Sequence, residues 1–196
     1  MGLMLELLPS LGPALVVGGG AVAARKAESL AAAGFAVTVV SPSIVKVLTG
    51  RPGFTLRRRA FVPADVAGHA VVFACTGDRE VNRLVGQLAR EAGVPVVVAD
   101  SQDESTAFSP AVHRDGDLQV AVSTHGASPA VAAQVRDQIA ASLGDGWAER
   151  VEAARAARAE KPRRPVKVLI PFDATPEQIE AAVVQILGPR PAKAKR

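Results

Sequence analysis

The sequence predicts an α/β fold in which helices flank a parallel β-sheet. Apolar runs at residues 14–17, 36–40, 70–75 and 94–99 alternate with segments of helical spacing, and this alternation is typical of strands joined by crossover helices. Three glycines follow the first run directly and lead without a break into a helix. With 196 residues, 48% of them hydrophobic, the chain can bury one main core and a smaller appendage.

The helices between these runs are predicted from the spacing of their apolar residues. The first has a face of small residues beginning at Val22, and Gly34 ends it. Phe54 to Arg58 is a further candidate strand, followed by a loop at 63–65. A second helix follows Asp78, and its apolar residues at helical spacing are Val81, Leu84, Val85, Leu88 and Ala92.

After a polar linker at 101–106 the pattern changes to two strands without a helix between them. Strands at 108–113 and 118–123 flank the residues 114–117, whose Asp and Gly predict a hairpin turn. Ser128 and Pro129 begin a helix with a buried face that extends to Leu143. Because a hairpin and one helix bury little apolar surface alone, we expect a homodimer.

The last fifty residues predict a short α/β segment. Residues 147–160 read as an alanine-rich helix that is interrupted at 161–165, and residues 166–170 read as a strand. Thr175 begins a capping-box helix that ends at Leu187. The predicted organisation is a Rossmann-type parallel sheet domain over 1–105, a small dimerisation domain over 106–143, and a carboxy-terminal segment with a basic tail over 144–196.

Composition argues against several classes of protein. The net charge is +4, but three positive charges lie in the terminal tail. The chain has six Phe, one Trp and no Tyr, so it lacks the alternating aromatic and basic residues that bind nucleic acid. No apolar stretch approaches the roughly 18 residues of a membrane span, and the amino terminus lacks the pattern of a secretory leader. We therefore expect a cytoplasmic protein. Cys75 is the single cysteine and is expected to fill the core.

The glycine loop is the clearest candidate site. Gly18, Gly20 and Ala23 form a G-x-G-x-x-A pattern between a strand and a helix, where glycines allow a tight turn and the helix amino terminus faces an anion. This context predicts a site for the pyrophosphate of a dinucleotide. The alternative is a glycine-rich turn that binds nothing.

Polar residues follow two further strands at the same predicted sheet edge. Ser41 stands where a nicotinamide site usually has Asp or Glu, so a ribose contact is possible but discrimination against a 2′-phosphate is weaker. The alternative for Ser41 is that it begins a helix over 42–48. Thr76 and Asn82 are expected to face the crevice, whereas Asp78 is equally well explained as a helix cap.

Two more segments carry residues suited to proton transfer. Asp100 ends an apolar strand, where a carboxylate can remove a proton, although a plain turn aspartate is the alternative. His125 lies in a loop of small residues at 123–129 that runs into a helix, and it is either a proton-transfer residue or an exposed loop histidine. His69 and His113 have no neighbours at metal-ligand spacing, so no metal site is predicted.

Six motifs in order resemble the siroheme synthase amino-terminal family, whose members are precorrin-2 dehydrogenases, some of them also sirohydrochlorin ferrochelatases. The resemblance covers residues 1 to about 143. The motifs lie at 16–26, 37–42, 75–78 with Asn82, 97–100, 108–111 and 120–129.

The resemblance implies NAD-dependent oxidation of precorrin-2 to sirohydrochlorin on a homodimer whose central domain exchanges strands. It implies Asp100 as the general base, with His125 as a second proton-transfer candidate. Substrate contacts are implied in the same loop, at Thr124, Gly126 and Ser128. The cofactor contacts it implies are Gly18, Gly20, Ala21, Val22, Ser41, Thr76 and Asn82.

The chain departs from the family pattern after residue 143, where members usually continue with a helical bundle that covers the tetrapyrrole. This departure bears most on chelation, which needs the macrocycle to be held. One alternative is therefore a bifunctional enzyme that also inserts ferrous iron, and a separate chelatase is a possible partner. An alternative of another class is a non-catalytic NAD-sensing module, which needs only the first hundred residues.

Overall fold

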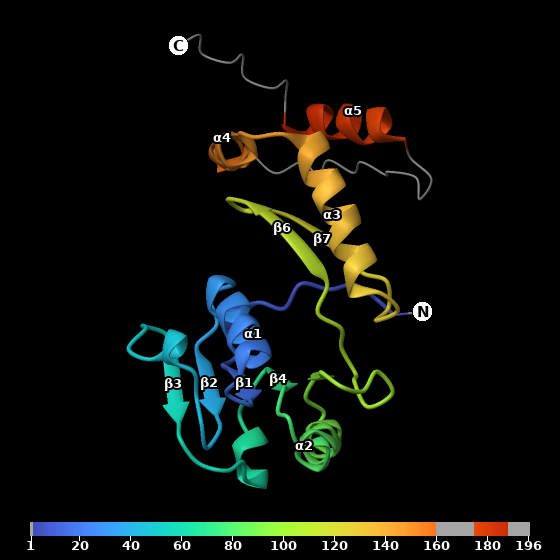
Figure 1. The fold of residues 1–196 in the computed structure, drawn as a ribbon. Coiled ribbons are helices and arrows are strands. Elements are labelled where there is room, and N and C mark those ends of the chain that lie inside the picture. Colours follow the sequence, from blue (N-terminus) through green and yellow to red (C-terminus); the bar gives the residue numbers. More distant parts are fainter. Residues whose placement is uncertain (1, 160–174, 188–196) are drawn as a thin grey trace. The chain divides into compact units, whose positions relative to one another are not determined.

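The computed structural model describes residues 2–159 and 175–187 (Figure 1). They form two compact units: residues up to Ser109 together with His125–Ala127, and Pro110–Thr124 together with the described residues from Ser128 onward. The three-domain division stays a prediction. The expected strand at 166–170 lies outside the described residues.

The first unit contains a five-stranded parallel sheet, as predicted. Its order is β3-β2-β1-β4-β5, and in-register pairs such as Val16 with Val39 and Phe73 join the three central strands. The strands are β1 Ala14–Val17, β2 Val37–Val40, β3 Phe54–Arg57, β4 Val71–Ala74 and β5 Val96–Val98. The additional strand predicted at 54–58 is therefore confirmed. The runs predicted at 36–40, 70–75 and 94–99 form shorter strands than expected.

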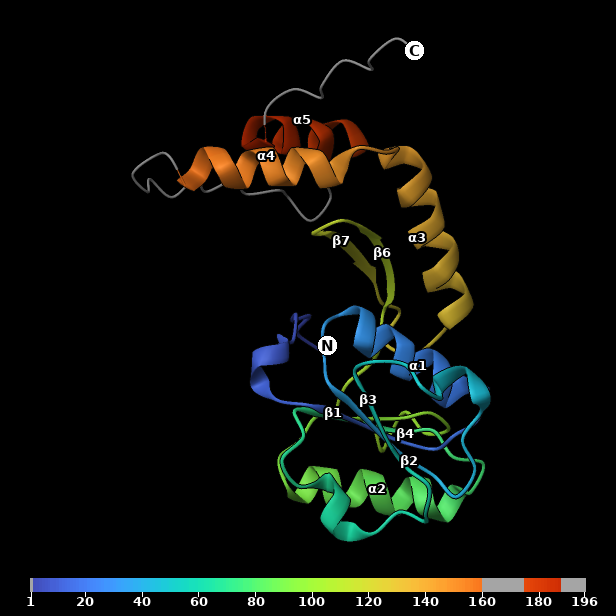
Figure 2. The ribbon, with the colours of Figure 1, turned by 90° about the vertical axis from the view of Figure 1, so that its left-hand side faces the viewer.

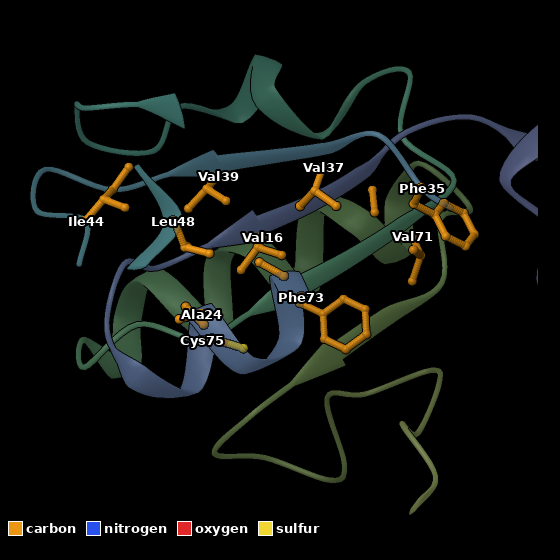
Figure 3. Close-up of a cluster of buried hydrophobic side chains, with 13 residues drawn as sticks. Val16, Ala24, Phe35, Val37, Val39, Ile44, Leu48, Val71, Phe73 and Cys75 are labelled. Carbon is orange, nitrogen blue, oxygen red and sulfur yellow. The ribbon is translucent and has the colours of Figure 1, made fainter. Parts of the chain in front are cut away.

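Helices cover both faces of this sheet. Alternate residues of β1 point to opposite faces: Val16 packs with α1 (Ala21–Ala32) and Leu15 packs with the core beneath α2 (Arg79–Glu91). Figure 2 shows the two helices on opposite sides of the strands. Figure 3 shows the cluster on the α1 face, which includes Cys75 as a core residue. Burial raises the pKa of the Cys75 thiol to about 11, so this cysteine is a packing residue and not a nucleophile.

The strand order locates the binding edge of the sheet. From β1 the chain first adds β2 and β3 on one side, then crosses to add β4 and β5 on the other. In such sheets ligands bind beyond the carboxyl ends of the strands at the position where the order reverses. Here that position lies between β1 and β4, next to Gly18 and Thr76.

A buried carboxylate holds the loop after β3. Asp65 is 3% exposed, and its oxygens accept hydrogen bonds from Arg57 at 2.9 Å, from Arg59 at 2.5 and 2.7 Å, and from the Val62 amide at 3.0 Å. The bond from Arg59 contributes most to lowering the pKa of Asp65 to about 2, against an opposing effect of burial. Of the three consecutive arginines at 57–59, Asp65 thus pairs with two: Arg57 at the end of β3, and Arg59 after it.

The second unit is built on an antiparallel hairpin of β6 (Ala111–Asp115) and β7 (Leu118–Val122). The first strand begins later than the predicted 108–113, because Pro110 has no N–H to donate to a ladder. The turn has two central residues, not four, and Gly116 supplies its positive φ of 57°. The helix α3 (Pro129–Leu143) packs on both strands.

Two further helices follow α3, as the sequence predicted. They are α4 (Trp147–Ala159) and α5 (Pro176–Leu187). The hairpin and α4 are joined by Asp115, which accepts a 2.8 Å hydrogen bond from the Trp147 amide, and by an ion pair between Asp117 and Arg155. Trp147 is 4% exposed, with the Arg150 guanidinium 4.0 Å from its ring centre. None of the helices described in residues 2–159 and 175–187 is long and apolar enough to cross a membrane.

The Asp65 cluster predicts a specific dependence of stability on pH. Because the pKa of Asp65 is lowered from 3.8 to about 2 on folding, its ionised form stabilises the fold above about pH 4, and this stabilisation is lost as the pH falls toward 2. Asp65→Asn should lower the free energy of unfolding by about 2 kcal/mol at pH 7 and remove that part of the pH dependence, as measured by urea unfolding.

The matched control is Asp117→Asn, which removes a carboxylate that is 59% exposed in its pair with Arg155. We expect this change to cost less than about 1 kcal/mol. Equal losses in the two variants at pH 7 would contradict the role assigned to Asp65.

Candidate functional site

The first two glycines of the loop after β1 are fixed by their neighbours. A Cβ on Gly18, whose φ is 125°, would lie 2.3 Å from the Cys75 carbonyl oxygen, and one on Gly19 would lie 1.9 Å from the Ser43 carbonyl oxygen. The Gly18 amide donates to the Val40 carbonyl at 2.9 Å, and the Gly19 carbonyl accepts from the Val45 amide at 3.0 Å. The loop is therefore packed against the ends of β2 and β4 with no space for side chains.

The third glycine faces open space. Gly20 is the N-cap of α1 without a side-chain cap, and no protein atom lies within 4 Å of where its Cβ would be. Ala21 and Val22 are exposed, whereas Ala23 is completely buried against the sheet. An uncapped helix amino terminus beside an open backbone fits a phosphate group, which the exposed amides and the helix dipole attract.

The end of β2 carries no carboxylate. Ser41 is half-buried and its amide donates to the Arg57 carbonyl at 3.1 Å. The helix considered for residues 42–48 does not form, and a single 3-10 turn at Lys46–Leu48 takes its place. Ser41 therefore lies directly after β2 at the sheet edge, with its amide bonded to the last residue of β3.

The end of β4 is organised around α2. Asp78 caps this helix by accepting hydrogen bonds from the Glu80 and Val81 amides at 2.9 and 3.2 Å, so the capping explanation for Asp78 is confirmed. Thr76 is half-buried, and its hydroxyl accepts from the Asp78 amide at 3.1 Å. Asn82 was expected to face the crevice, but its side chain is completely buried. Its amide contacts Thr76 and Asp100 instead.

Asp100 lies two residues after β5 and its side chain is 39% exposed. One carboxylate oxygen accepts a 3.0 Å hydrogen bond from the Asn82 amide nitrogen, and the other is 4.0 Å from the Arg79 guanidinium. Arg79 also donates to Glu104 at 2.5 Å, which lowers the pKa of Glu104 below its ordinary value. Asp100 is thus held in place while remaining accessible, which is what a general base requires.

Arg79 and Glu104 were not predicted from the sequence. In the sequence, Arg79 is an arginine at the first position of a capped helix and Glu104 is a glutamate in a polar linker. Both patterns are common on protein surfaces, so neither indicated a site. The structure brings them together because the chain returns past α2 after β5, and Arg90 of α2 also donates to the Glu104 carbonyl at 3.1 Å.

The loop at 123–128 contributes to both units. Thr124 and Ser128 belong to the second unit, where the Thr124 hydroxyl accepts from the Ser128 amide at 3.0 Å and the Ser128 hydroxyl caps α3 by accepting from Val131. His125 and Gly126 belong to the first unit. Both have positive φ, 54° and 79°, and the Gly126 carbonyl accepts a 2.6 Å hydrogen bond from Gln102.

The structure therefore brings His125 and Gly126 beside the segment that follows Asp100. The His125 Nε2 atom accepts from the Gly2 amide at 3.2 Å, and its ring meets Phe108 edge-on with 6.1 Å between ring centres. Among the described residues, no group of three or more His, Cys, Asp or Glu side chains is arranged to hold a metal ion.

Comparison with known families matches most of the described chain. Residues 10–111 match a family described as putative NAD(P)-binding. Residues 115–142 match a family described as the sirohaem biosynthesis protein central region. The boundary between the two matches falls within β6.

Curated relatives carry the name siroheme synthase. The chain is 42% identical to one from Methylococcus capsulatus over 130 residues, which is 65% of this chain and 27% of the relative. It is 40% identical over 133 residues to one from Nitrosomonas eutropha, covering 66% of this chain and 28% of the relative. The chain thus spans little more than a quarter of the length of these relatives.

A solved structure, named SirC, precorrin-2 dehydrogenase, has a similar fold. Its TM-score is 0.66 at 22% sequence identity, with 95% of this chain and 89% of that chain covered. At this identity the comparison establishes the fold, including the parallel sheet.

The glycine loop makes a prediction with opposite outcomes at adjacent positions. Gly19→Ala should lower the free energy of unfolding by about 3 kcal/mol or more, because its Cβ collides with a backbone carbonyl. Gly20→Ala should leave stability nearly unchanged, yet it should weaken NAD binding at least about tenfold, or about 1.4 kcal/mol, since the methyl group stands where a phosphate approaches. Urea unfolding and titration calorimetry with NAD measure the two effects. Unchanged NAD affinity in Gly20→Ala would mean that no phosphate lies over this glycine.

Proposed function

Because the chain belongs to the putative NAD(P)-binding family, we propose that it catalyses the NAD-dependent dehydrogenation of precorrin-2 to sirohydrochlorin, a step of siroheme biosynthesis. The observation that carries this proposal is the accessible, held carboxylate of Asp100 in the same unit as the open glycine loop. The names of the relatives over the same residues support it. The reaction removes a hydride and a proton from the macrocycle.

We assign the cofactor as NAD, bound over the loop between β1 and α1. The amides near Gly20, Ala21 and Val22 bind the pyrophosphate, and Gly18 allows the turn that presents them. Ser41 lies at the ribose, and Thr76 lines the crevice beyond β4. Asn82, which was expected at this site, is buried and bonded to Thr76, so we assign it no direct contact with the cofactor. When bound, the nicotinamide accepts the hydride.

We assign the proton to Asp100. Its carboxylate takes a ring proton as conjugation extends around the macrocycle, so that one hydride and one proton leave the substrate together. His125 is a second proton-transfer candidate, because it is exposed and its neighbour Gly126 is bonded to Gln102 in the segment that follows Asp100.

We assign substrate binding to the loop at 123–128. Precorrin-2 carries many carboxylates, and backbone amides at the amino terminus of α3 are suited to them. Thr124, Gly126 and Ser128 shape this loop through the hydrogen bonds described above. Its hydroxyl groups are partly committed to the loop itself, so the backbone contributes at least as much as the side chains.

We also propose a homodimer in which the hairpin exchanges strands with a second copy. A two-stranded hairpin leaves a backbone edge on each strand, and such pairs are marginally stable alone. Val131 and Val135 on α3 are 48% and 37% exposed, which is apolar surface that a second copy would cover. Sedimentation equilibrium should give twice the 20.2 kDa mass of the chain. A monomer at micromolar concentration would contradict this assignment.

Two other functions are compatible with parts of the site. The first is a bifunctional enzyme that also inserts ferrous iron. Iron-dependent consumption of sirohydrochlorin above the spontaneous rate would support it. Without such activity, a separate chelatase takes the product. A non-catalytic NAD-sensing module binds NAD but ignores tetrapyrroles, and calorimetry with sirohydrochlorin separates it from the enzyme. We place the proposed reaction in the cytoplasm.

The direct test combines the purified chain, precorrin-2 and NAD, with growth of the sirohydrochlorin spectrum as the measurement. Asp100→Ala should lower turnover at least about 100-fold, the usual contribution of a general base, while calorimetry shows NAD affinity unchanged. Asp103→Ala, in the same loop and exposed to solvent, is the matched control and should retain activity. An inactive wild-type chain, beside an active control enzyme, would refute the function. An active Asp100→Ala variant would remove Asp100 from the mechanism.

A further inference from the structure

We propose that Asn82 is the positioning residue that fixes the carboxylate of Asp100 for proton transfer, an inference that rests on the function proposed above. Asn82 lies one turn into α2, and it has no exposed surface. It therefore cannot bind a ligand on its own side chain without rearrangement. Its role follows from what its amide contacts inside the protein.

Every hydrogen-bonding atom of the Asn82 amide is used. The oxygen accepts from the Thr76 amide at 3.0 Å and lies 2.8 Å from the Thr76 hydroxyl. The nitrogen donates one hydrogen to the Thr76 carbonyl at 3.1 Å and the other to Asp100 Oδ2 at 3.0 Å. A buried amide with complete partners is held in one position.

The orientation of this amide is determined by its partners. Rotating it by half a turn would place its oxygen against the Thr76 carbonyl and the Asp100 carboxylate, which are both acceptors. The nitrogen therefore faces Asp100 in the bonded arrangement. Asp100 loses the freedom to turn about its last torsion, because one oxygen is bonded to a side chain that cannot move.

The bond leaves the other oxygen of Asp100 for chemistry. That oxygen is 4.0 Å from Arg79, beyond a hydrogen bond, and the side chain is 39% exposed. Arg79 is bonded more closely to Glu104, at 2.5 Å. Asn82 thus supplies the short contact that orients Asp100, and Arg79 does not compete for it.

The same amide links Asp100 to the turn after β4. Thr76 begins this turn, and its backbone is bonded to Asn82 in both directions. Movement of the turn is therefore transmitted to Asp100 through two hydrogen bonds and one rigid side chain. This arrangement couples the position of the base to a segment that borders the proposed cofactor crevice.

Kinetics of Asn82→Ala test the inference. A base that is free to rotate is misplaced for much of the time, so kcat should fall about 10- to 100-fold, with NAD affinity and the KM for precorrin-2 nearly unchanged. Val85→Ala is the control, because Val85 lies on the same helix, is equally buried and does not contact Asp100. A loss of NAD affinity that parallels the loss of kcat would instead make Asn82 a cofactor-binding residue and overturn the inference, as would an equal loss of kcat in Val85→Ala.

A second measurement does not depend on activity or on the Asn82 variant folding. In the nuclear magnetic resonance spectrum, one side-chain amide proton of Asn82 should move upfield in Asp100→Ala, since it loses a charged acceptor. Glu104→Gln removes a neighbouring carboxylate that does not contact Asn82, so that proton should keep its shift. If the Asn82 amide proton keeps its shift in Asp100→Ala, the inference is overturned, whether or not the wild-type enzyme is active. If this proton shifts in Asp100→Ala but the wild-type chain does not turn over precorrin-2, the proposed reaction is refuted. The contact between Asn82 and Asp100 is then still supported.

Discussion

Close backbone contact at Gly18 and Gly19 is the constraint on which the rest of the site depends. These residues lie between the ends of β2 and β4, at distances from Ser43 and Cys75 that leave no space for a Cβ. Because the loop is so short and so close to the sheet, α1 begins immediately after it, with its first amides at the sheet edge. A longer or bulkier loop would move the helix terminus away from the position where the strand order reverses.

That edge also collects the polar groups that the core excludes. Strands β1, β2 and β4 are buried along their whole length, so the charged residues of this unit lie outside them, some of them near strand ends. Each charge there has a partner suited to its burial: Asp65, nearly inaccessible, is bonded by two arginines, whereas Asp100, partly exposed, is bonded by a neutral amide. A neutral donor orients a carboxylate without stabilising its charge as strongly as a cation does. Asp65 is thereby fixed as a structural carboxylate, whereas the Asp100 side chain is oriented and stays partly exposed.

The sequence predicted the sheet and the helices because these depend on local patterns. Alternating apolar runs, Gly34 after α1 and Asp78 before α2 were sufficient to locate the elements of the first unit. Strand ends were less accurate, since Pro110 delays β6 and the ladder of β5 ends before Ala99. The carboxy-terminal helices followed from their capping residues and composition.

What the sequence could not predict are contacts between residues distant in the chain. Gly19 is a variable position in the glycine pattern, and its collision with Ser43 depends on how β2 ends. Glu104 reaches Arg79 across a separation of 25 residues. Asn82 was expected beside the cofactor because of its position after β4, and only the structure reveals that its amide points inward. Such contacts form when the fold brings distant segments together, and the spacing of residues within one segment does not predict them.

The amide of Asn82 also separates the enzymatic interpretation from the sensing one. A module that only binds a dinucleotide needs the glycine loop and the end of β2, both of which are complete without Asp100. The buried Asn82 amide holds the turn at Thr76, and its remaining hydrogen bond is directed at a partly exposed carboxylate, which cofactor binding alone does not require. Oriented, accessible carboxylates are what proton transfer requires. In the proposed function the glycines hold the oxidant, and the Asn82–Asp100 contact is the part of the same unit that serves the substrate.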